Sequence, residues 1–529
     1  MSGDQNCANF LVQYQCGHRS SGTSVLFHRD RMDSEHSDYF DNMPNQFVNY
    51  ATFTFVIESM AIANGIIKMD AKDNLDEIEN EEETNEDLCS ATAEIENKFL
   101  ADEDDETLTV LSSVSSVSDR QTDYGTVDIY DESDVYEITE HAELGRIAKM
   151  VMKREGVIFF YICMCVYLYG DLSVYCTAIS RTLRDFTWYV PPFPNLTLHF
   201  TFSYSTIQPI LHNETLTEMD PCWQSFRVSR MFAYRLYVFG TILVLGPFVF
   251  FDLHNTKFLQ IFTLSFRLLA FTAFVTLTTI ALAKGNGDGR PVEANFSNIP
   301  NFFGVAIFAF ISHQALPSII TPIKQKKHLL SISLVNFLFI AIFYLLICFT
   351  GAFTFNHVND VYALNFVSHK HYSLIPEVPV LTFILPLYPL FTISANFPIN
   401  AITLRNNLKL LFTSSSESFH STFWFQRIAF PILTLLPVFC IAITTSNLVW
   451  LVSLVGNYTG ILIQCVIPSL ILIYARRRVK EICESNHLFA QFLNTENKYK
   501  SPFGYNVVIY SILIWSIICL CLITANLIL

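Results

Sequence analysis

The sequence predicts an all-α polytopic membrane protein, and three observations carry that prediction. Of the 529 residues, 51% are hydrophobic and 48 are Phe. Only 15% are charged, whereas soluble proteins carry about 25%. Apolar runs of about 20 residues, the length that crosses a bilayer as a helix, recur along the chain. These features together exclude an ordinary soluble domain and imply the lipid bilayer as a partner.

The acidity of the chain belongs to one segment. The formal net charge is -15, yet residues 70–140 hold 25 acidic and 3 basic residues, so the rest of the chain sums to +7. A segment this acidic, with few large aliphatic side chains, is expected to be a disordered loop over residues 68–140. It offers a docking segment for a cytosolic partner. The charge pattern gives no support to nucleic-acid binding.

The elements follow in order along the chain. Residues 1–45 are polar and irregular, and we expect no stable core there. Residues 46–67 form the first visible span, the acidic loop follows, and residues 141–529 form the main transmembrane domain. The ten expected spans are Phe47–Ile67, Val157–Ser180, Leu236–Leu253, Phe258–Ala283, Phe302–Ile323, Leu329–Phe355, Leu374–Ile399, Arg427–Thr445, Leu448–Tyr474 and Tyr505–Leu527.

Sequons and basic residues give the orientation. The polar loop 182–234 contains the glycosylation motifs of Asn195 and Asn213, which require an outside location. Alternation then places the motif of Asn295 outside as well. From residue 254 onward, the inside loops hold 13 Lys and Arg and the outside loops hold three, which is the positive-inside pattern. The acidic loop therefore lies in the cytosol, and ten spans put residues 1–45 outside.

The span Phe302–Ile323 is predicted to be broken. It carries Ser312, His313 and Gln314 in its middle, and Pro317 just beyond. Irregular backbone survives at membrane depth only where protein or a water-filled cavity surrounds it. A broken helix beside a binding site is a feature of many secondary transporters. We therefore expect these three polar residues, with Asn396 in the next long Pro-containing span, to contact a substrate.

Ionisable residues inside spans are functional hypotheses, because each costs about 2.5–3.5 kcal/mol on insertion scales. Asp171 follows Gly170 in an aromatic helix. Burial favours the neutral form of a carboxylate, which suits proton coupling, and the alternative is a structural Asp at a helix break. His313 either exchanges a proton or contacts substrate, or is satisfied by a carbonyl. We expect Glu58 and Arg267 to be structural and to pair with each other.

Several stretches carry a resemblance to a known family. They are VIESMAIAN (56–64), ELGRIAKM (143–150), VYLYGDLSVY (166–175), LGPFVFFD (245–252), HQALPSIITP (313–322), TISANFPINAITLRNN (392–407) and SPFGY (501–505). The chain from about residue 46 onward resembles the transmembrane protein 104 family, which is similar to the amino-acid/auxin permease group of transporters. The resemblance implies a five-plus-five inverted repeat with a central site between broken helices one and six.

The resemblance also implies eleven helices, of which the first carries a small glycine-rich motif. Residues 1–45 have polar sequence where that helix is expected, which explains the count of ten spans. Two interpretations stay open. One is a truncated first exon. The other is an isoform that lacks half of the substrate site, because the first helix supplies the partner of the span at residues 302–323.

Two functions from different classes follow. The leading hypothesis is a secondary transporter of amino acids or similar small solutes, coupled to H⁺ or Na⁺, in a plasma or endolysosomal membrane. The alternative is a non-transporting membrane sensor or scaffold that keeps the transporter fold. An enzyme is not expected, because the sequence shows no nucleophile–base pair and no phosphate loop. No cofactor is expected, and the absence of CxxC and HExxH motifs predicts no metal site.

Overall fold

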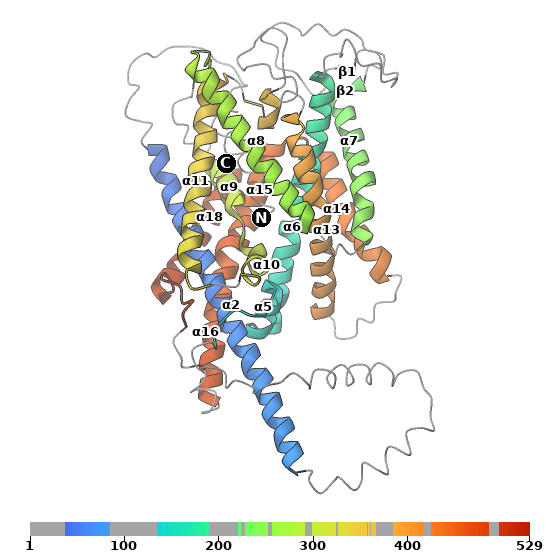
Figure 1. The fold of residues 1–529 in the computed structure, drawn as a ribbon. Helices are drawn as coiled ribbons and strands as arrows, with labels where there is room; N and C mark the ends of the chain where they lie inside the picture. The colour runs from blue at the N-terminus through green and yellow to red at the C-terminus, as the bar shows by residue number, and fades with distance from the viewer. Residues whose placement is uncertain are drawn as a thin grey trace.

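The computed structural model is a bundle of long helices (Figure 1). It describes residues 37–84, 135–140, 142–189, 221–223, 228–251, 257–290, 299–323, 326–356, 358–359, 361–366, 384–415, 425–485, 493 and 497–528. Within these ranges, nine helices are long and apolar enough to cross a membrane. They match nine of the ten expected spans. The other, Leu374–Ile399, lies partly outside the described residues, and its second half belongs to helix α13 (Tyr388–Ser415).

Helix α2 (Ser37–Thr84) is longer than the expected first span. It begins within the N-terminal segment that was expected to be irregular and ends within the expected acidic loop. Its C-terminal end projects past the bundle (Figure 1). Residues 68–84 contain five Glu, and Glu is a good helix former, which favours continuation of the helix past the apolar span. Residues 85–134, most of the acidic segment, lie outside the described residues.

Helix α6 (Arg154–Tyr189) lies at the centre of the bundle. It packs against α13, α7 (Arg230–Leu245), α14 (Phe430–Thr444) and α15 (Leu448–Val455). Its apolar window is 72% buried, and that of α2 is 94% buried. The corresponding windows of α11 (Leu329–Thr354) and α18 (Asn506–Ile528) are only 28% buried, so their apolar side chains form the outer surface that faces lipid.

The remaining elements connect or flank these helices. A two-stranded hairpin of β1 (Pro221–Trp223) and β2 (Val228–Ser229) precedes α7. The other described elements are α5 (Leu144–Val151), η3 (Gly246–Phe250), α8 (Lys257–Ala283), η6 (Tyr362–Phe366), η7 (Phe425–Ala429) and α16 (Ile467–Ser485). Helix α5 is amphipathic and buries Leu144, Ile147 and Val151 beside α6, α16 and α2.

Two of the described spans depart from regular α-helix in their middle. The span predicted to be broken consists of α9 (Ile299–Phe310), a 3-10 turn η5 (His313–Ala315) and the short helix α10 (Leu316–Ile320). The span that begins with α15 continues through two π-helical turns, η8 (Gly456–Gly460) and η9 (Leu462–Val466), into α16. Single π-turns inside helices occur often at functional sites. The two irregular spans face each other, since α9 packs against α15 and η8 and η5 packs against η9.

Candidate functional site

The break between α9 and α10 has a local cause. Pro317 has no N–H, and its ring excludes the carbonyl of His313 from an α-helical position. The chain responds with a tighter turn, in which the Leu316 N–H donates to the His313 carbonyl oxygen and the Ala315 N–H donates to the Ser312 carbonyl oxygen at 3.0 Å. The predicted break is therefore confirmed, and it ends α9 at Phe310.

His313 lies in the wall between the break and α2. Its side chain is fully buried, and its Nε2 lies 3.0 Å from Thr52 Oγ1. The Thr52 hydroxyl also lies 3.0 Å from the carbonyl oxygens of Val48 and Asn49, which only accept hydrogen bonds. We therefore assign the hydroxyl proton to a carbonyl and the Nε2 proton to His313. This tautomer leaves Nδ1 as an acceptor, and Nδ1 has no partner in the structure.

Other polar atoms around the break are also buried without a hydrogen-bond partner. They are Asn49 Oδ1, Ser312 Oγ and Gln314 Oε1. Asn49 is held by its other amide atom, since Nδ2 donates to the Phe310 carbonyl oxygen at 3.4 Å. A buried polar group without a partner costs roughly 1–3 kcal/mol, so each one requires an explanation. A ligand that donates hydrogen bonds would satisfy this group of acceptors.

The π-helical turns carry two further amides, one beside Gly304 in the middle of α9 and one on the turn that packs against η5. Asn457 lies on η8 and Gln464 lies on η9, and each has a buried side-chain oxygen without a partner. The close approach depends on glycine. A Cβ on Gly456 would lie 1.9 Å from the Gly304 carbonyl oxygen, and a Cβ on Gly304 would lie 2.6 Å from Asn457 Oδ1. Backbone therefore meets backbone where η8 crosses α9.

Asp171 lies in a second polar region, between α6 and α13. Its carboxylate is fully buried, and its Oδ2 accepts a hydrogen bond from Asn400 Nδ2 at 2.5 Å, while Oδ1 has no partner. Asn396 lies one turn before Asn400 on the same face of α13 and is 8% exposed. The preceding Gly170 is packed against α15, since a Cβ there would lie 2.5 Å from Val455 Cγ2.

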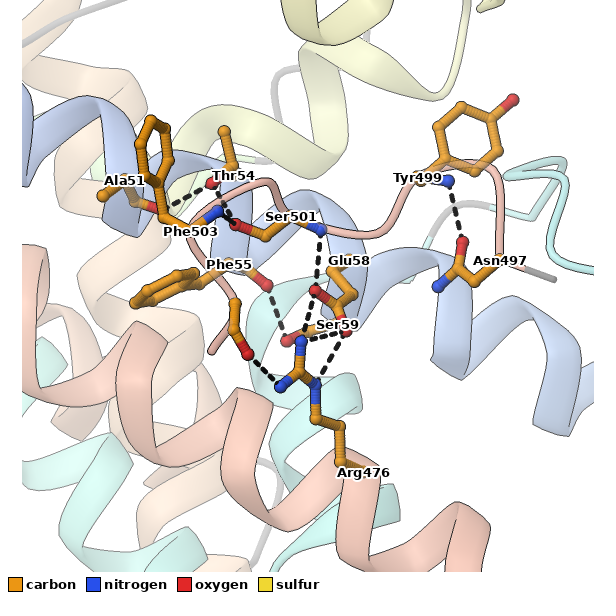
Figure 2. A network of polar contacts seen from close by, with 11 residues as sticks. Ala51, Thr54, Phe55, Glu58, Ser59, Arg476, Asn497, Tyr499, Ser501 and Phe503 are labelled. Atoms are coloured by element: carbon orange, nitrogen blue, oxygen red, sulfur yellow. Dashed lines mark hydrogen bonds and ion pairs between the residues drawn. The ribbon is translucent and has the colours of Figure 1, made fainter. Parts of the chain in front are cut away.

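The expected pair of Glu58 and Arg267 is wrong. Glu58 on α2 forms an ion pair with Arg476 on α16, with Arg476 Nη2 2.7 Å from Glu58 Oε1 (Figure 2). The physical reason is the packing of the helices, because α2 lies along α16, whereas Arg267 lies on α8, which packs against α11 and α13. Arg267 is 9% exposed. Both charges are buried, and the structural role of both residues stays a prediction.

The structure thus divides the predicted site residues into two groups. Ser312, His313 and Gln314 lie together at the break, where His313 contacts α2. Asp171 instead contacts α13, which also carries Asn396. The sequence reasoning missed the residues Asn49, Thr52, Asn400, Asn457 and Gln464. The signal that could have found them is an amide or hydroxyl side chain inside an apolar run, because such a group needs a hydrogen-bond partner at membrane depth.

The remaining predictions concern glycosylation and metal binding. The glycosylation motifs of Asn195, Asn213 and Asn295 lie outside the described residues. Over the ranges that the structure describes, no three His, Cys, Asp or Glu side chains are grouped so that they could hold a metal ion.

Comparisons with known proteins give a consistent result. Residues 110–514 match the family described as Transmembrane amino acid transporter protein. The chain is 35% identical over 488 residues to Transmembrane protein 104 of Homo sapiens, which covers 91% of this chain and 88% of that protein. It is 35% identical over 395 residues to the Drosophila melanogaster homolog, 74% of each chain, and 28% identical over 506 residues to the Dictyostelium discoideum homolog.

Proposed function

This chain belongs to the transmembrane protein 104 family, a set of multi-pass membrane proteins with an amino acid transporter domain, and from that premise we propose that it is a secondary transporter. The proposed cargo is an amino acid or a similar small solute, moved together with H⁺ or Na⁺. The proposed substrate site lies where the break after α9 meets α2 and the π-helical turns.

The observation that carries the proposal is the set of unpaired acceptors at the break. Asn49 Oδ1, His313 Nδ1 and Gln314 Oε1 are buried without partners. Acceptors of this kind fit a group that brings several N–H donors, and an ammonium group has three. The C-terminal end of α9 adds the negative end of a helix dipole, which favours a positive charge. An α-amino group or a monovalent cation satisfies both features.

Asp171 is the proposed coupling residue. It is a buried carboxylate held by a neutral amide, Asn400, on a neighbouring helix. Gain or loss of one proton changes the charge at this position by a full unit, and buried charges in membranes are costly. Protonation of Asp171 therefore changes the free energy by enough to shift how α6 packs against α13. The same carboxylate oxygen would serve as a ligand if the coupling ion is Na⁺.

Uptake by the purified full-length protein in proteoliposomes tests the proposal. Radiolabelled amino acids are offered under an imposed H⁺ gradient, an imposed Na⁺ gradient, or neither. We expect one gradient to drive uptake, Asp171→Asn to remove the gradient dependence, and His313→Ala to weaken substrate binding. Asp288→Asn and His328→Ala are matched controls, because both residues are exposed.

Two outcomes would overturn parts of the proposal. Unchanged gradient-driven uptake in Asp171→Asn and His313→Ala would remove their assigned roles. Failure of the wild-type protein to take up any amino acid would favour the sensor or scaffold function, with the acidic segment 68–140 as its docking segment.

A further inference from the structure

One carboxylate, that of Glu58, joins α2 to α16 through Arg476 (Figure 2). Arg476 donates from Nε to Glu58 Oε1 at 2.8 Å and from Nη2 to Glu58 Oε2 at 2.9 Å. Glu58 is 3% exposed. Removing Arg476 would leave the buried charge of Glu58 without its partner, so the ion pair holds α2 against α16.

A third segment, the connection that leads into α18, joins the same carboxylate. The Ser501 backbone N–H donates to Glu58 Oε2 at 2.8 Å, and Arg476 Nη1 donates to the Gly504 carbonyl oxygen (Figure 2). Thr54 Oγ1 lies 2.7 Å from Ser501 Oγ. A Cβ on Gly504 would lie 2.3 Å from Arg476 Nη2, so glycine permits this approach. We call these five residues the inner clasp.

The distribution of basic residues places the inner clasp toward the cytosolic end of the bundle. Its neighbours in sequence are Arg477, Arg478 and Lys480 on α16, and Lys498 and Lys500 in the connection. Basic residues next to spans mark the cytosolic side.

A second contact holds α2 further toward its C-terminus. Asn64 Oδ1 accepts hydrogen bonds from the backbone N–H groups of Thr139 at 3.1 Å and Glu140 at 2.8 Å. Tyr136 OH donates to the Leu493 carbonyl oxygen at 2.6 Å. We call residues 135–140 the inner strap. The strap links α2 to Leu493, and the clasp links α2 to α16 and to residues 501–504. Both therefore attach the cytosolic half of α2 to the connection between α16 and α18.

The same helix reaches the candidate substrate site. Glu58 follows Thr52 by fewer than two helical turns, about 9 Å along the axis. Thr52 is the residue that contacts His313, and Asn49 contacts the end of α9. Because α2 is continuous over these residues, a movement of Glu58 away from Arg476 moves the wall of the substrate site as well.

Water can reach one edge of the clasp, which favours its opening. The Arg476 side chain is 27% exposed, so water reaches its edge and can replace the protein partners as they separate. The crossing of α9 and η8 is different in kind, because backbone touches backbone there at Gly304 and Gly456.

We propose that the inner clasp is a cytosolic gate, which is closed in this structure and opens when the candidate site connects with the cytosol. The gate rests on the proposed transport function, because a protein without a cargo needs no alternating access. Opening separates α2 from α16 and from the 497–504 connection. It also draws Thr52 away from His313.

Hydrogen–deuterium exchange of the full-length protein in nanodiscs tests the gate without any substrate. In Glu58→Gln, we expect amide exchange to rise about tenfold or more in peptides over 497–505 and also over 311–316. Arg477→Gln is the matched control, because it removes an adjacent arginine whose side chain is 70% exposed and pairs with Glu481. If Glu58→Gln does not fold, Arg476→Lys weakens the same contact while it keeps the charge.

The outcomes separate the gate from a purely structural tie. Faster exchange over 497–505 with no change over 311–316 would overturn the gate, and so would an equal response in Arg477→Gln. Uptake measured in parallel tests the proposed function separately. A protein that transports nothing, yet shows the paired rise in exchange, would refute the transport proposal and retain the mechanical link between clasp and break.

Discussion

Thr52 Oγ1 and His313 Nε2 lie 3.0 Å apart, and this contact joins the continuous helix α2 to the broken span that holds the candidate site. In the tautomer that we assign, the Thr52 hydroxyl donates to a backbone carbonyl and accepts from His313 Nε2. His313 therefore presents an acceptor nitrogen to the interior. The site is thus set by a residue that lies 261 positions away in the sequence.

Removing the Thr52 hydroxyl should weaken binding of a substrate that donates hydrogen bonds. In Thr52→Val, which keeps the shape of the side chain, we expect the half-saturating substrate concentration to rise about tenfold, the equivalent of one hydrogen bond. Thr52→Ser keeps the hydroxyl and should bind nearly normally. Thr276→Val, at an exposed position on α8, is the control. Equal impairment of the Ser and Val variants would contradict the assigned role.

The crossing of α9 and η8 should not tolerate a single added methyl group. In Gly456→Ala, the new Cβ would meet the Gly304 carbonyl oxygen at 1.9 Å, so we expect a loss of about 3 kcal/mol in stability. Gly240→Ala on α7 is the matched control, because a Cβ there meets nothing within 4 Å, and it should stabilise by about 0.5–1 kcal/mol. Thermal unfolding in nanodiscs measures both. Similar melting temperatures for the two variants would refute the backbone contact.

Tyr136 should hold the inner strap through its hydroxyl. Tyr136→Phe removes the hydrogen bond to Leu493 and should cost about 1 kcal/mol, seen as faster hydrogen exchange over 135–142. Tyr505→Phe is the control, because Tyr505 is 73% exposed. If both variants exchange like the wild type, the hydroxyl does not hold the strap.

The strap should also loosen at high pH. Burial, reinforced by the nearby Cys483, raises the pKa of Tyr136 to about 12 from its ordinary value of 10. Because the folded value is the higher one, the contribution of Tyr136 to stability is complete below about pH 10 and is lost as the pH rises toward 12. Exchange over 135–142 should therefore accelerate across this range in the wild type. The acceleration should be smaller in Tyr136→Phe.

A covalent bond across the inner clasp should stop transport reversibly. The side-chain oxygens of Thr54 and Ser501 lie 2.7 Å apart, so sulfur atoms at these positions are within reach of each other. Oxidation of the double variant Thr54→Cys with Ser501→Cys should abolish uptake, and a reducing agent should restore it. Each single variant, treated in the same way, is the control. Uptake that continues through a confirmed cross-link would show that the clasp does not open during transport.

The local features of the sequence predicted most of the helical architecture. Hydropathy located the spans, because a bilayer requires long apolar helices whatever surrounds them. The break at His313 was also predictable, since Pro317 acts on its own helix and polar residues at that depth need a partner. These are properties of neighbouring residues, which a single sequence displays.

The partners of those residues could not be predicted in the same way. Glu58 and Arg476 are separated by 418 positions, and nothing near either residue indicates the other. Hydropathy identified a charge inside a span but not the face of α2 that carries it. The length of α2 was also missed, because composition alone does not distinguish an acidic helix from an acidic loop when both are exposed to water.

The two π-helical turns decide how the span from α15 to α16 responds to insertions and deletions. A π-turn contains one more residue than an α-turn needs, and each α-helical residue rotates the next by about 100°. Each turn therefore stores one residue, and deleting one residue within η8 or η9 would close that turn as α-helix while α16 keeps its direction. Inserting one residue into α16 before Arg476 would instead rotate Arg476 by about 100° away from Glu58, although every residue of the clasp was still present. An insertion in α16 would therefore act like the loss of a charge, whereas a deletion in a π-helical turn would not.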